Sequence, residues 1–164
     1  MLYQLKPLFM GEKESLPIDC EMDFSGLEYQ NGRPFPHPVR VKGEIAVSAD
    51  IVTLQITAST RTEGRCDRCL TAFGRDMTVP IERILVSSLN NEENDDFVLL
   101  ENYQLPLDDL VEEELILNLP SKNLCRKDCR GLCPQCGKNL NEGLCGCRSD
   151  TTDPRLEVLR QLIN

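Results

Sequence analysis

Apolar and polar residues alternate along two neighbouring runs within residues 39–60. A period of two residues is typical of β-strands that bury one face, so we expect two strands here. The tripeptide "SAD" at 48–50 separates the runs and predicts the corner of a β-hairpin. The apolar positions expected to face the core are Val39, Val41, Ile45, Val47, Leu54, Ile56 and Ala58.

A further strand is predicted in the stretch "MTVPIERILVSS" at 77–88. Pro80 has no backbone N–H to donate, which places this strand at a sheet edge or at a bulge. The stretch "LEYQNGRPFPHP" at 27–38 is rich in turn-forming residues and predicts a loop. His37, the single histidine, lies in this loop, and we expect it to be exposed and to have no functional role.

The segment "LDDLVEEELIL" has apolar residues at helical spacing and predicts a helix near residues 108–118, which Pro120 ends. Asp109 and Glu112 have the spacing of a capping box at its N-terminus. The expected apolar face consists of Leu107, Leu110, Val111 and Leu115.

A second, short helix is predicted at the C-terminal end, with Asp153 as its cap and Pro154 at its first position. The polar stretch "SSLNNEENDD" at 87–96 predicts an acidic loop or linker.

These elements together predict an α+β fold. Residues 1–120 are expected to form an acidic antiparallel β-sheet body, a meander or set of hairpins with one helix. Residues 121–164 are expected to form a cysteine-rich, zinc-knuckle tail with the C-terminal helix, integrated with the body into one domain.

Charge is unevenly distributed along this 164-residue chain, whose formal net charge is −9. Residues 1–120 contain 10 basic and 22 acidic side chains, whereas residues 121–164 contain eight basic and five acidic ones. The acidic body does not suit broad contact with phosphate backbones. It is either a solvated surface or a docking surface for a basic partner, such as a ribosomal protein.

The first residues, "MLYQLKPLFM", contain no apolar run long enough for an export signal or a membrane span. We therefore expect a cytoplasmic protein without membrane contact. Disulfides are rare in that compartment, where clustered cysteines more often bind metal or perform redox chemistry.

Eight of the nine cysteines fall into two groups, the pair in "GRCDRCL" and six in the tail. A two-residue spacer lets both sulfurs of a C-x-x-C motif reach one zinc ion, and "CPQCG" fits such a knuckle. "CGC" can supply two more thiolates from the same side of an extended chain. The first predicted zinc site is therefore Cys133, Cys136, Cys145 and Cys147.

The remaining four clustered cysteines can form a second four-thiolate site that joins the sheet to the tail, so that one or two structural zinc ions are expected. Alternatively, Cys125 or Cys129 competes for the first ion. Cys20 stands alone and is expected to be a small buried apolar residue. The second predicted site is Cys66, Cys69, Cys125 and Cys129.

Redox chemistry is an alternative for the Cys66–Cys69 pair. A thioredoxin-type motif needs a helix after its first cysteine, and the residues that follow here favour a strand. Nucleic-acid binding is a second alternative, because the tail has basic residues. However, no aromatic residue follows Tyr103 in the sequence, so the tail has no side chain on which unpaired bases could stack. The tail cations that can make non-specific RNA contact are Arg126, Lys127, Arg130, Lys138 and Arg148.

We expect no enzymatic activity and no small-molecule substrate. The sequence has no phosphate-binding glycine loop and no histidine near a cysteine. A zinc ion enclosed by four thiolates has no open position for water or substrate.

Four stretches together resemble the YceD family of bacterial and plastid proteins. They are "GRCDRCLTAF", "LPLDDLVEEELILNLPSKNLC", "CRKDCRGLCPQCGKNLNEGLCGC" and "DPRLEVLRQL", in this order and with matching spacing over residues 40–164. Some relatives keep the middle cysteine pair and lack most tail cysteines, which implies that the middle pair can have an independent role.

The resemblance implies a non-enzymatic role in large ribosomal subunit biogenesis and accumulation of its 23S-type ribosomal RNA. The expected partner is a basic large-subunit ribosomal protein or a pre-ribosomal particle. The alternatives are a thiol-disulfide redox factor that uses Cys66 and Cys69, or a zinc-dependent adaptor outside the ribosome.

Overall fold

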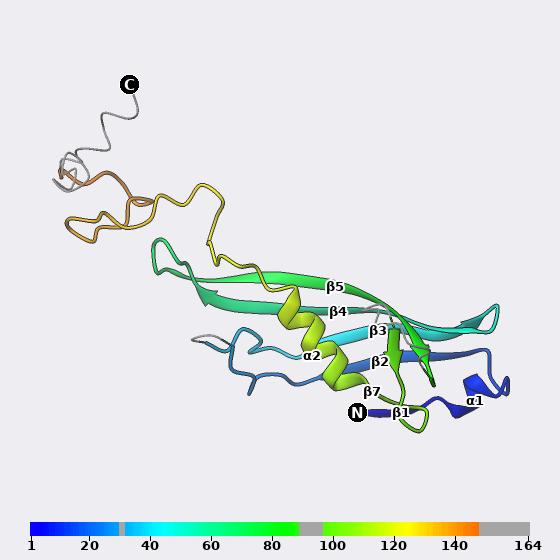
Figure 1. Cartoon of the computed structure of the whole chain (residues 1–164). Coiled ribbons are helices and arrows are strands. Elements are labelled where there is room, and N and C mark those ends of the chain that lie inside the picture. Colours follow the sequence, from blue (N-terminus) through cyan, green and yellow to red (C-terminus); the bar gives the residue numbers. More distant parts are fainter. Residues whose placement is uncertain (30–31, 89–96, 148–164) are drawn as a thin grey trace.

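The structure is a computed structural model that describes residues 1–29, 32–88 and 97–147 (Figure 1). The predicted C-terminal helix, Arg148 and most of the predicted 87–96 loop lie outside the described residues. The elements are β1 (Leu2–Gln4), α1 (Lys6–Phe9), β2 (Ser15–Met22), β3 (Val39–Ser48), β4 (Ile51–Arg65), β5 (Ala72–Val86), β6 (Phe97–Leu99), β7 (Gln104–Pro106) and α2 (Leu107–Leu117).

The body is a five-stranded sheet with the order β2-β3-β4-β5-β6, accompanied by a two-stranded ribbon of β1 and β7. Strands β2 to β5 form an antiparallel meander, as expected for the body; the sequence predicts β3, β4 and the second part of β5 within it, but not β2. The expectation of an entirely antiparallel sheet is wrong, because β6 pairs in parallel with the end of β5. Alternation of apolar residues predicts a strand but not its direction, and a strand of three residues is too short to show a pattern.

The predicted hairpin corner is confirmed between β3 and β4. Ala49 and Asp50 both have positive φ, 48° and 63°, as a two-residue type I′ turn requires. Pro80 is confirmed at a sheet edge, since β6 pairs only with the last three residues of β5. The β4–β5 register continues past Pro80 without a bulge.

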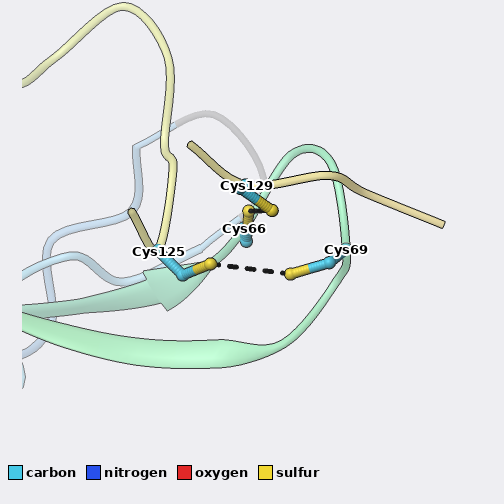
Figure 2. A group of neighbouring side chains, drawn as sticks. All are labelled: Cys66, Cys69, Cys125 and Cys129. Atoms are coloured by element: carbon cyan, nitrogen blue, oxygen red, sulfur yellow. Dashed lines mark hydrogen bonds between the residues drawn. The ribbon is translucent and has the colours of Figure 1, made fainter. Parts of the chain in front are cut away.

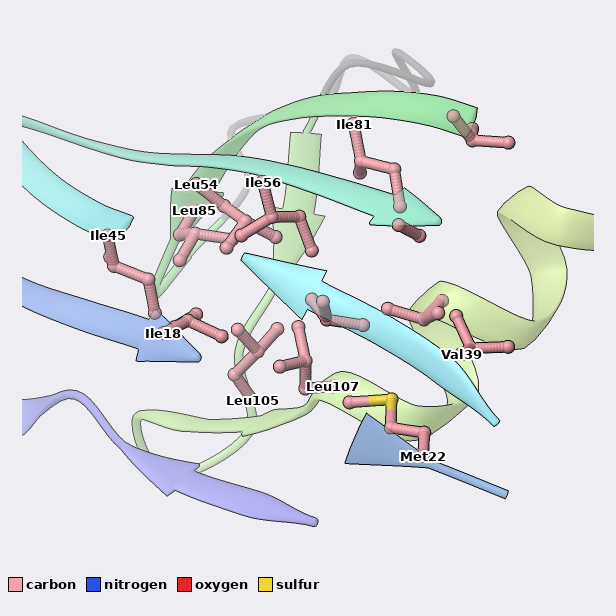
Figure 3. Packing of buried hydrophobic residues seen from close by; sticks show 14 of the residues in the cluster. Ile18, Met22, Val39, Ile45, Leu54, Ile56, Ile81, Leu85, Leu105 and Leu107 are labelled. Atoms are coloured by element: carbon pink, nitrogen blue, oxygen red, sulfur yellow. The ribbon is translucent and has the colours of Figure 1, made fainter. Parts of the chain in front are cut away.

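Helix α2 lies across one face of the sheet, and its apolar side closes the core (Figures 1 and 3). Leu107, Val111 and Leu115 are fully buried, and Leu110 is partly buried against them, as predicted. The buried positions labelled in Figure 3 are Ile18, Met22, Val39, Ile45, Leu54, Ile56, Ile81, Leu85, Leu105 and Leu107.

The predicted capping box of α2 is wrong. The chain enters the helix directly from β7, so Pro106 occupies the cap position and no side chain caps the helix there. Asp109 lies inside the first turn, where its charge suits the positive end of the helix dipole. Its neighbour Asp108 pairs with the amino group of Met1.

Candidate metal centre

Strands β4 and β5 extend beyond the rest of the sheet as a two-stranded arm. β3 accompanies β4 only as far as Ser59, whereas the β4–β5 ladder continues to the pair Arg65 and Ala72. We call residues 60–77 the hairpin arm. Its turn contains Cys66 and Cys69, both buried.

The two C-x-x-C motifs have the same backbone hydrogen bonds. In the hairpin turn, the Cys66 N–H donates to Thr71 O at 2.9 Å and the Leu70 N–H donates to Cys66 O at 2.8 Å. In the tail, the Cys133 N–H donates to Lys138 O at 2.8 Å and the Gly137 N–H donates to Cys133 O at 2.9 Å. Each motif is therefore a knuckle that turns both of its thiols toward one point.

The residue after each knuckle adopts a left-handed conformation. Gly137 has φ of 72°, which costs glycine little. Leu70 occupies the same place with φ of 60°, although a left-handed leucine costs roughly 1–2 kcal/mol. The geometry of the knuckle thus outweighs the conformational preference of the side chain.

Four hydrogen bonds attach the first part of the tail to the hairpin turn. The backbone of Asn123 exchanges two bonds with Asp67, one to the carboxylate and one from the Asp67 N–H, both at 2.7 Å. Arg68 donates to Cys129 O at 2.9 Å and accepts from the Leu132 N–H at 3.0 Å. These contacts place residues 123–132 directly against the turn.

The tail thereby brings two more thiols to the turn (Figure 2). Cys66 Sγ lies 3.7 Å from Cys129 Sγ, and Cys69 Sγ lies 3.6 Å from Cys125 Sγ. All four sulfurs lie within 4.8 Å of one another. We call these four residues the hairpin group: Cys66, Cys69, Cys125 and Cys129.

The other four tail cysteines form a second set with the same compactness, again with all sulfurs within 4.8 Å of one another. Its surroundings differ, since Cys133 is buried whereas Cys136 and Cys147 are exposed. We call these residues the tail group: Cys133, Cys136, Cys145 and Cys147. The two groups are the same two sets of four that the sequence suggests, and Cys125 and Cys129 lie with the hairpin pair.

The sulfur separations fit a tetrahedral ion. With Zn–S bonds of about 2.3 Å, the edges of a four-thiolate tetrahedron are about 3.8 Å long. The sulfur contacts of 3.6 and 3.7 Å match this edge, and a disulfide would need about 2.05 Å. A four-sulfur donor set suits zinc and leaves no position for substrate, so an ion held here would be structural. That these residues bind zinc stays a prediction.

Asn141 supports the hairpin group from outside. Its Nδ2 donates to Cys129 Sγ at 3.3 Å, and its Oδ1 accepts from the Arg130 N–H at 2.9 Å and from Arg126 at 2.7 Å. Donors directed at a thiolate sulfur stabilise its negative charge and orient it.

Electrostatics divide the hairpin group into two kinds of thiol. Burial raises the pKa of Cys66, but backbone N–H groups of Cys125, Cys69 and Arg68 outweigh it and lower that pKa to about 6. Burial and the neighbouring thiols raise the pKa of Cys125 to about 12. Some thiols therefore ionise readily, and their charge then holds protons on the others.

The tail group shows the same division. Backbone N–H groups of Cys136 and Gln135 lower the pKa of Cys133 to about 6. The neighbouring sulfurs of Cys136 and Cys145 raise the pKa of Cys147 to about 12. A divalent cation between four sulfurs would relieve this mutual repulsion.

The helix that a thioredoxin-type motif requires does not follow Cys66 and Cys69. The residues after Cys69 enter β5, so no helix begins at this motif to lower a thiol pKa by its dipole. The shortest sulfur contacts of the two cysteines run to the tail, from Cys66 to Cys129 and from Cys69 to Cys125.

The remaining predicted positions lie apart from both groups. Cys20 is half-buried and packs against the main core, close to what the sequence predicts. His37 is an exposed loop residue, as predicted, and its Nε2 lies 3.1 Å from Glu63 Oε1. Four of the predicted tail cations are exposed, namely Arg126, Lys127, Arg130 and Lys138.

The family described as "Large ribosomal RNA subunit accumulation protein YceD" matches residues 54–163. The chain belongs to this family. The match begins in β4 and includes both cysteine groups, and membership implies a role in accumulation of large-subunit ribosomal RNA. The family description names no chemical reaction.

Two kinds of relative have similar sequences. An uncharacterized protein of Mycobacterium tuberculosis is 31% identical over 111 residues, 65% of this chain and 53% of the relative. The uncharacterized protein YlbN of Bacillus subtilis is 26% identical over 128 residues, 77% of this chain and 74% of the relative. The chain thus spans about half the length of the mycobacterial relatives it matches. No solved structure matches it.

In residues 1–29, 32–88 and 97–147, no helix is both long enough and apolar enough to cross a bilayer.

Proposed function

We propose that this protein is a non-enzymatic factor of large ribosomal subunit biogenesis that supports accumulation of the 23S-type ribosomal RNA. The observation that carries the proposal is the family match, which covers the hairpin arm and all eight grouped cysteines. Ribosome assembly would place the chain in the cytoplasm, where its thiols stay reduced.

In this proposal each cysteine group holds one structural zinc ion. The ion in the hairpin group would fasten residues 123–132 to the sheet, and the ion in the tail group would fold residues 133–147. Structural zinc sites contribute on the order of 10 kcal/mol of apparent folding energy each. That energy orders a tail with few apolar side chains and makes body and tail act as one unit.

The acidic body is proposed to bind a basic ribosomal protein or a pre-ribosomal particle. The outer side of α2 supports this proposal, because Asp109, Glu112 and Glu113 border a shallow hollow of about 300 Å³ with Ile116 and Leu117. Leu117 is 69% exposed. Acidic and apolar side chains together fit a partner segment with lysine or arginine beside apolar residues.

The tail is proposed to face the RNA side of the particle. Arg126, Lys127, Arg130 and Lys138 are exposed there. Arg148, the fifth cation predicted for RNA contact, lies outside the described residues. Such contacts would be non-specific, since phosphate contacts position a protein without reading sequence.

The test is deletion of the chain's gene with complementation. Loss of the chain should lower mature large-subunit ribosomal RNA relative to the small-subunit RNA, and wild-type protein should restore it. Affinity purification at low salt should recover a large-subunit protein or precursor particle. Unchanged ribosomal RNA ratios after deletion, together with recovery of neither partner, would contradict the proposal.

A further inference from the structure

A hollow of about 710 Å³ lies where the tail leaves the body. Three parts of the chain line it: the loop between β2 and β3, the stem of the hairpin arm, and residues 118–123. A bond of 3.1 Å from the Glu63 N–H to Pro34 O attaches the loop to the arm, and the Asn123–Asp67 bonds attach the tail. All three walls are thus fixed to one another.

The acidic residues that line this hollow have partners within the protein. Glu63 lies 3.1 Å from His37, Asp76 lies 3.3 Å from Arg61, and Asp67 accepts the Asn123 N–H. These partners hold the three carboxylates at the rim in place. The lining has three arginines as well, and one of them, Arg33, pairs with Glu28 at 2.9 Å, so Arg65 and Arg75 are the lining cations left for a ligand.

Arg65 is the arginine available for a ligand. It is exposed at the end of β4 and makes no hydrogen bond or ion pair with any described side chain. Arg75 lies across the strand pair from Thr62 and uses one nitrogen to bind Leu124 O at 2.8 Å. Its planar guanidinium has further N–H groups for an anion.

The hollow also contains two partly exposed aromatic side chains, Tyr29 and Phe73. Arg75 lies over the Phe73 ring, with its guanidinium carbon 5.6 Å from the ring centre. The tail itself has no aromatic residue, so the fold supplies from the body what the tail lacks. Arginine beside aromatic faces is the combination by which proteins hold unpaired bases and their phosphates.

The uneven distribution of charge favours an anionic ligand at the end of the molecule formed by the hairpin turn and the tail. Outside the hairpin turn and tail, the described residues contain seven basic and 17 acidic side chains. Residues 65–75 and 121–147 contain eight basic and three acidic ones. Two four-thiolate zinc sites would subtract four charges and leave this end close to +1, still far less negative than the body.

We propose that this junction hollow binds a single-stranded segment of RNA, with Arg75 at one phosphate, Arg65, on the opposite face of the β4–β5 ladder, at a neighbouring phosphate, and a base against Tyr29 or Phe73. Its volume lies in the range of roughly 300–1,000 Å³ typical of small-ligand sites, which is too small for a duplex. RNA binding by this hollow adds a ligand site to the proposed function. It rests on the proposed function only for the identity of the RNA bound in the cell, which would be large-subunit ribosomal RNA.

The experiment uses the full, zinc-loaded chain and a fluorescein-labelled oligouridine of about 12 nucleotides, with fluorescence anisotropy as the readout. Affinity should fall about sevenfold between roughly 50 and 200 mM salt, as two phosphate contacts on a single strand imply. Arg65→Gln and Tyr29→Leu should each weaken binding by about fivefold or more. Lys13→Gln, which removes an exposed charge between α1 and β2, is the matched control and should change affinity by less than about twofold.

Zinc content and melting temperature of each variant establish that the fold is retained. Absence of binding at low salt, equal weakening by Lys13→Gln, or equal affinity for a hairpin duplex would each overturn the inference. Displacement of the RNA by a polyglutamate peptide that binds in its place would also overturn it, since the hollow would then select an acidic protein. If the chain does not bind the oligouridine but gene deletion still lowers large-subunit ribosomal RNA, this RNA site is refuted and the proposed function stands.

Discussion

The sulfur atoms of Cys66 and Cys129 lie 3.7 Å apart although 63 residues separate them in the chain. This contact joins the turn of the hairpin arm to the start of the tail. An ion shared by the two residues would therefore do more than fold a local loop, because it would fix where the tail leaves the sheet.

Cys66→Ser should release the tail from the hairpin arm. Removing one of the four thiolates weakens binding of the ion that would hold residues 123–132 against the turn. The tail then becomes accessible to protease. Limited trypsin digestion should cut at Arg126 or Lys127 much faster than in the wild type. Cys20→Ser is the control, since Cys20 lies outside both groups, and equal cleavage rates in all three proteins would count against the clamp.

Asn141→Leu should weaken zinc binding at the hairpin group by about 10–100-fold, because the donor to Cys129 Sγ is lost. The tail group provides an internal control, since its affinity should stay the same. Competition with a chelator series resolves the two sites. An equal loss at both sites would show that the substitution acts through general unfolding instead.

Zinc affinity should fall as the pH falls, and more steeply below about pH 6. The lowered pKa values of Cys66 and Cys133, about 6, mean that their thiolates exist at pH 7 and acquire protons only below that range. Cys125 and Cys147, with pKa values raised to about 12, lose protons when zinc binds even at neutral pH. Chelator competition between about pH 5 and 8 measures this dependence, and a flat profile would contradict thiolate ligation.

Breaking the buried ion pair between Arg83 of β5 and Glu114 of α2 should destabilise the fold. Glu114 is the buried charged residue among those described, and the side chains are 24% and 10% exposed. Glu114→Leu should cost about 2–4 kcal/mol in urea unfolding because it leaves Arg83 without its partner.

The exposed pair of Arg61 and Asp76 offers a matched control, with side chains 55% and 85% exposed. Asp76→Leu should change stability by less than about 1 kcal/mol. The combined variant Arg83→Met with Glu114→Leu should be more stable than Glu114→Leu alone. A double variant less stable than either single variant would mean that the pair does not act as a unit.

Gly43→Ala should destabilise the sheet by more than about 2 kcal/mol. Gly43 has φ of 151°, and an added Cβ would lie 2.1 Å from the Gln55 carbonyl oxygen of the neighbouring strand. A Cβ added to Gly64 of β4 would meet no atom within 4 Å, so Gly64→Ala should be nearly neutral. Thermal melts of the two variants compare them directly, and similar melting temperatures would refute the close approach of β3 and β4.

Much of the body could be predicted because its residues alternate in long runs. The β3–β4 hairpin and the apolar face of α2 follow from period-two and helical patterns that extend over many residues. The parallel strand β6 and the ribbon of β1 with β7 could not be predicted, since strands of three residues show no period. β2 was not predicted, although its apolar residues do alternate. Leu16, Ile18 and Met22 were the signal that could have indicated this strand, and Ile18 and Met22 are buried.

The two groups of four cysteines could be proposed from the sequence. The docking of the tail onto the hairpin turn, and the hollow that it creates, could not. Spacing identifies a knuckle such as "CPQCG", because neighbouring ligands are set by local geometry. The docking of Asp67 and Arg68 onto the tail depends on long-range hydrogen bonds that no spacing encodes. The junction hollow likewise arises from three segments far apart in the chain, so Tyr29 and Arg65 gave no joint signal.

Native mass spectrometry of freshly purified full-length protein, supported by elemental analysis, tests the central claim most directly. We predict two zinc ions per wild-type chain, one per Cys66→Ser chain and one per Cys136→Ser chain, with thiols that react only after a chelator is added. Metal-free wild-type protein with a reversible Cys66–Cys69 disulfide would contradict the account and point to thiol redox chemistry.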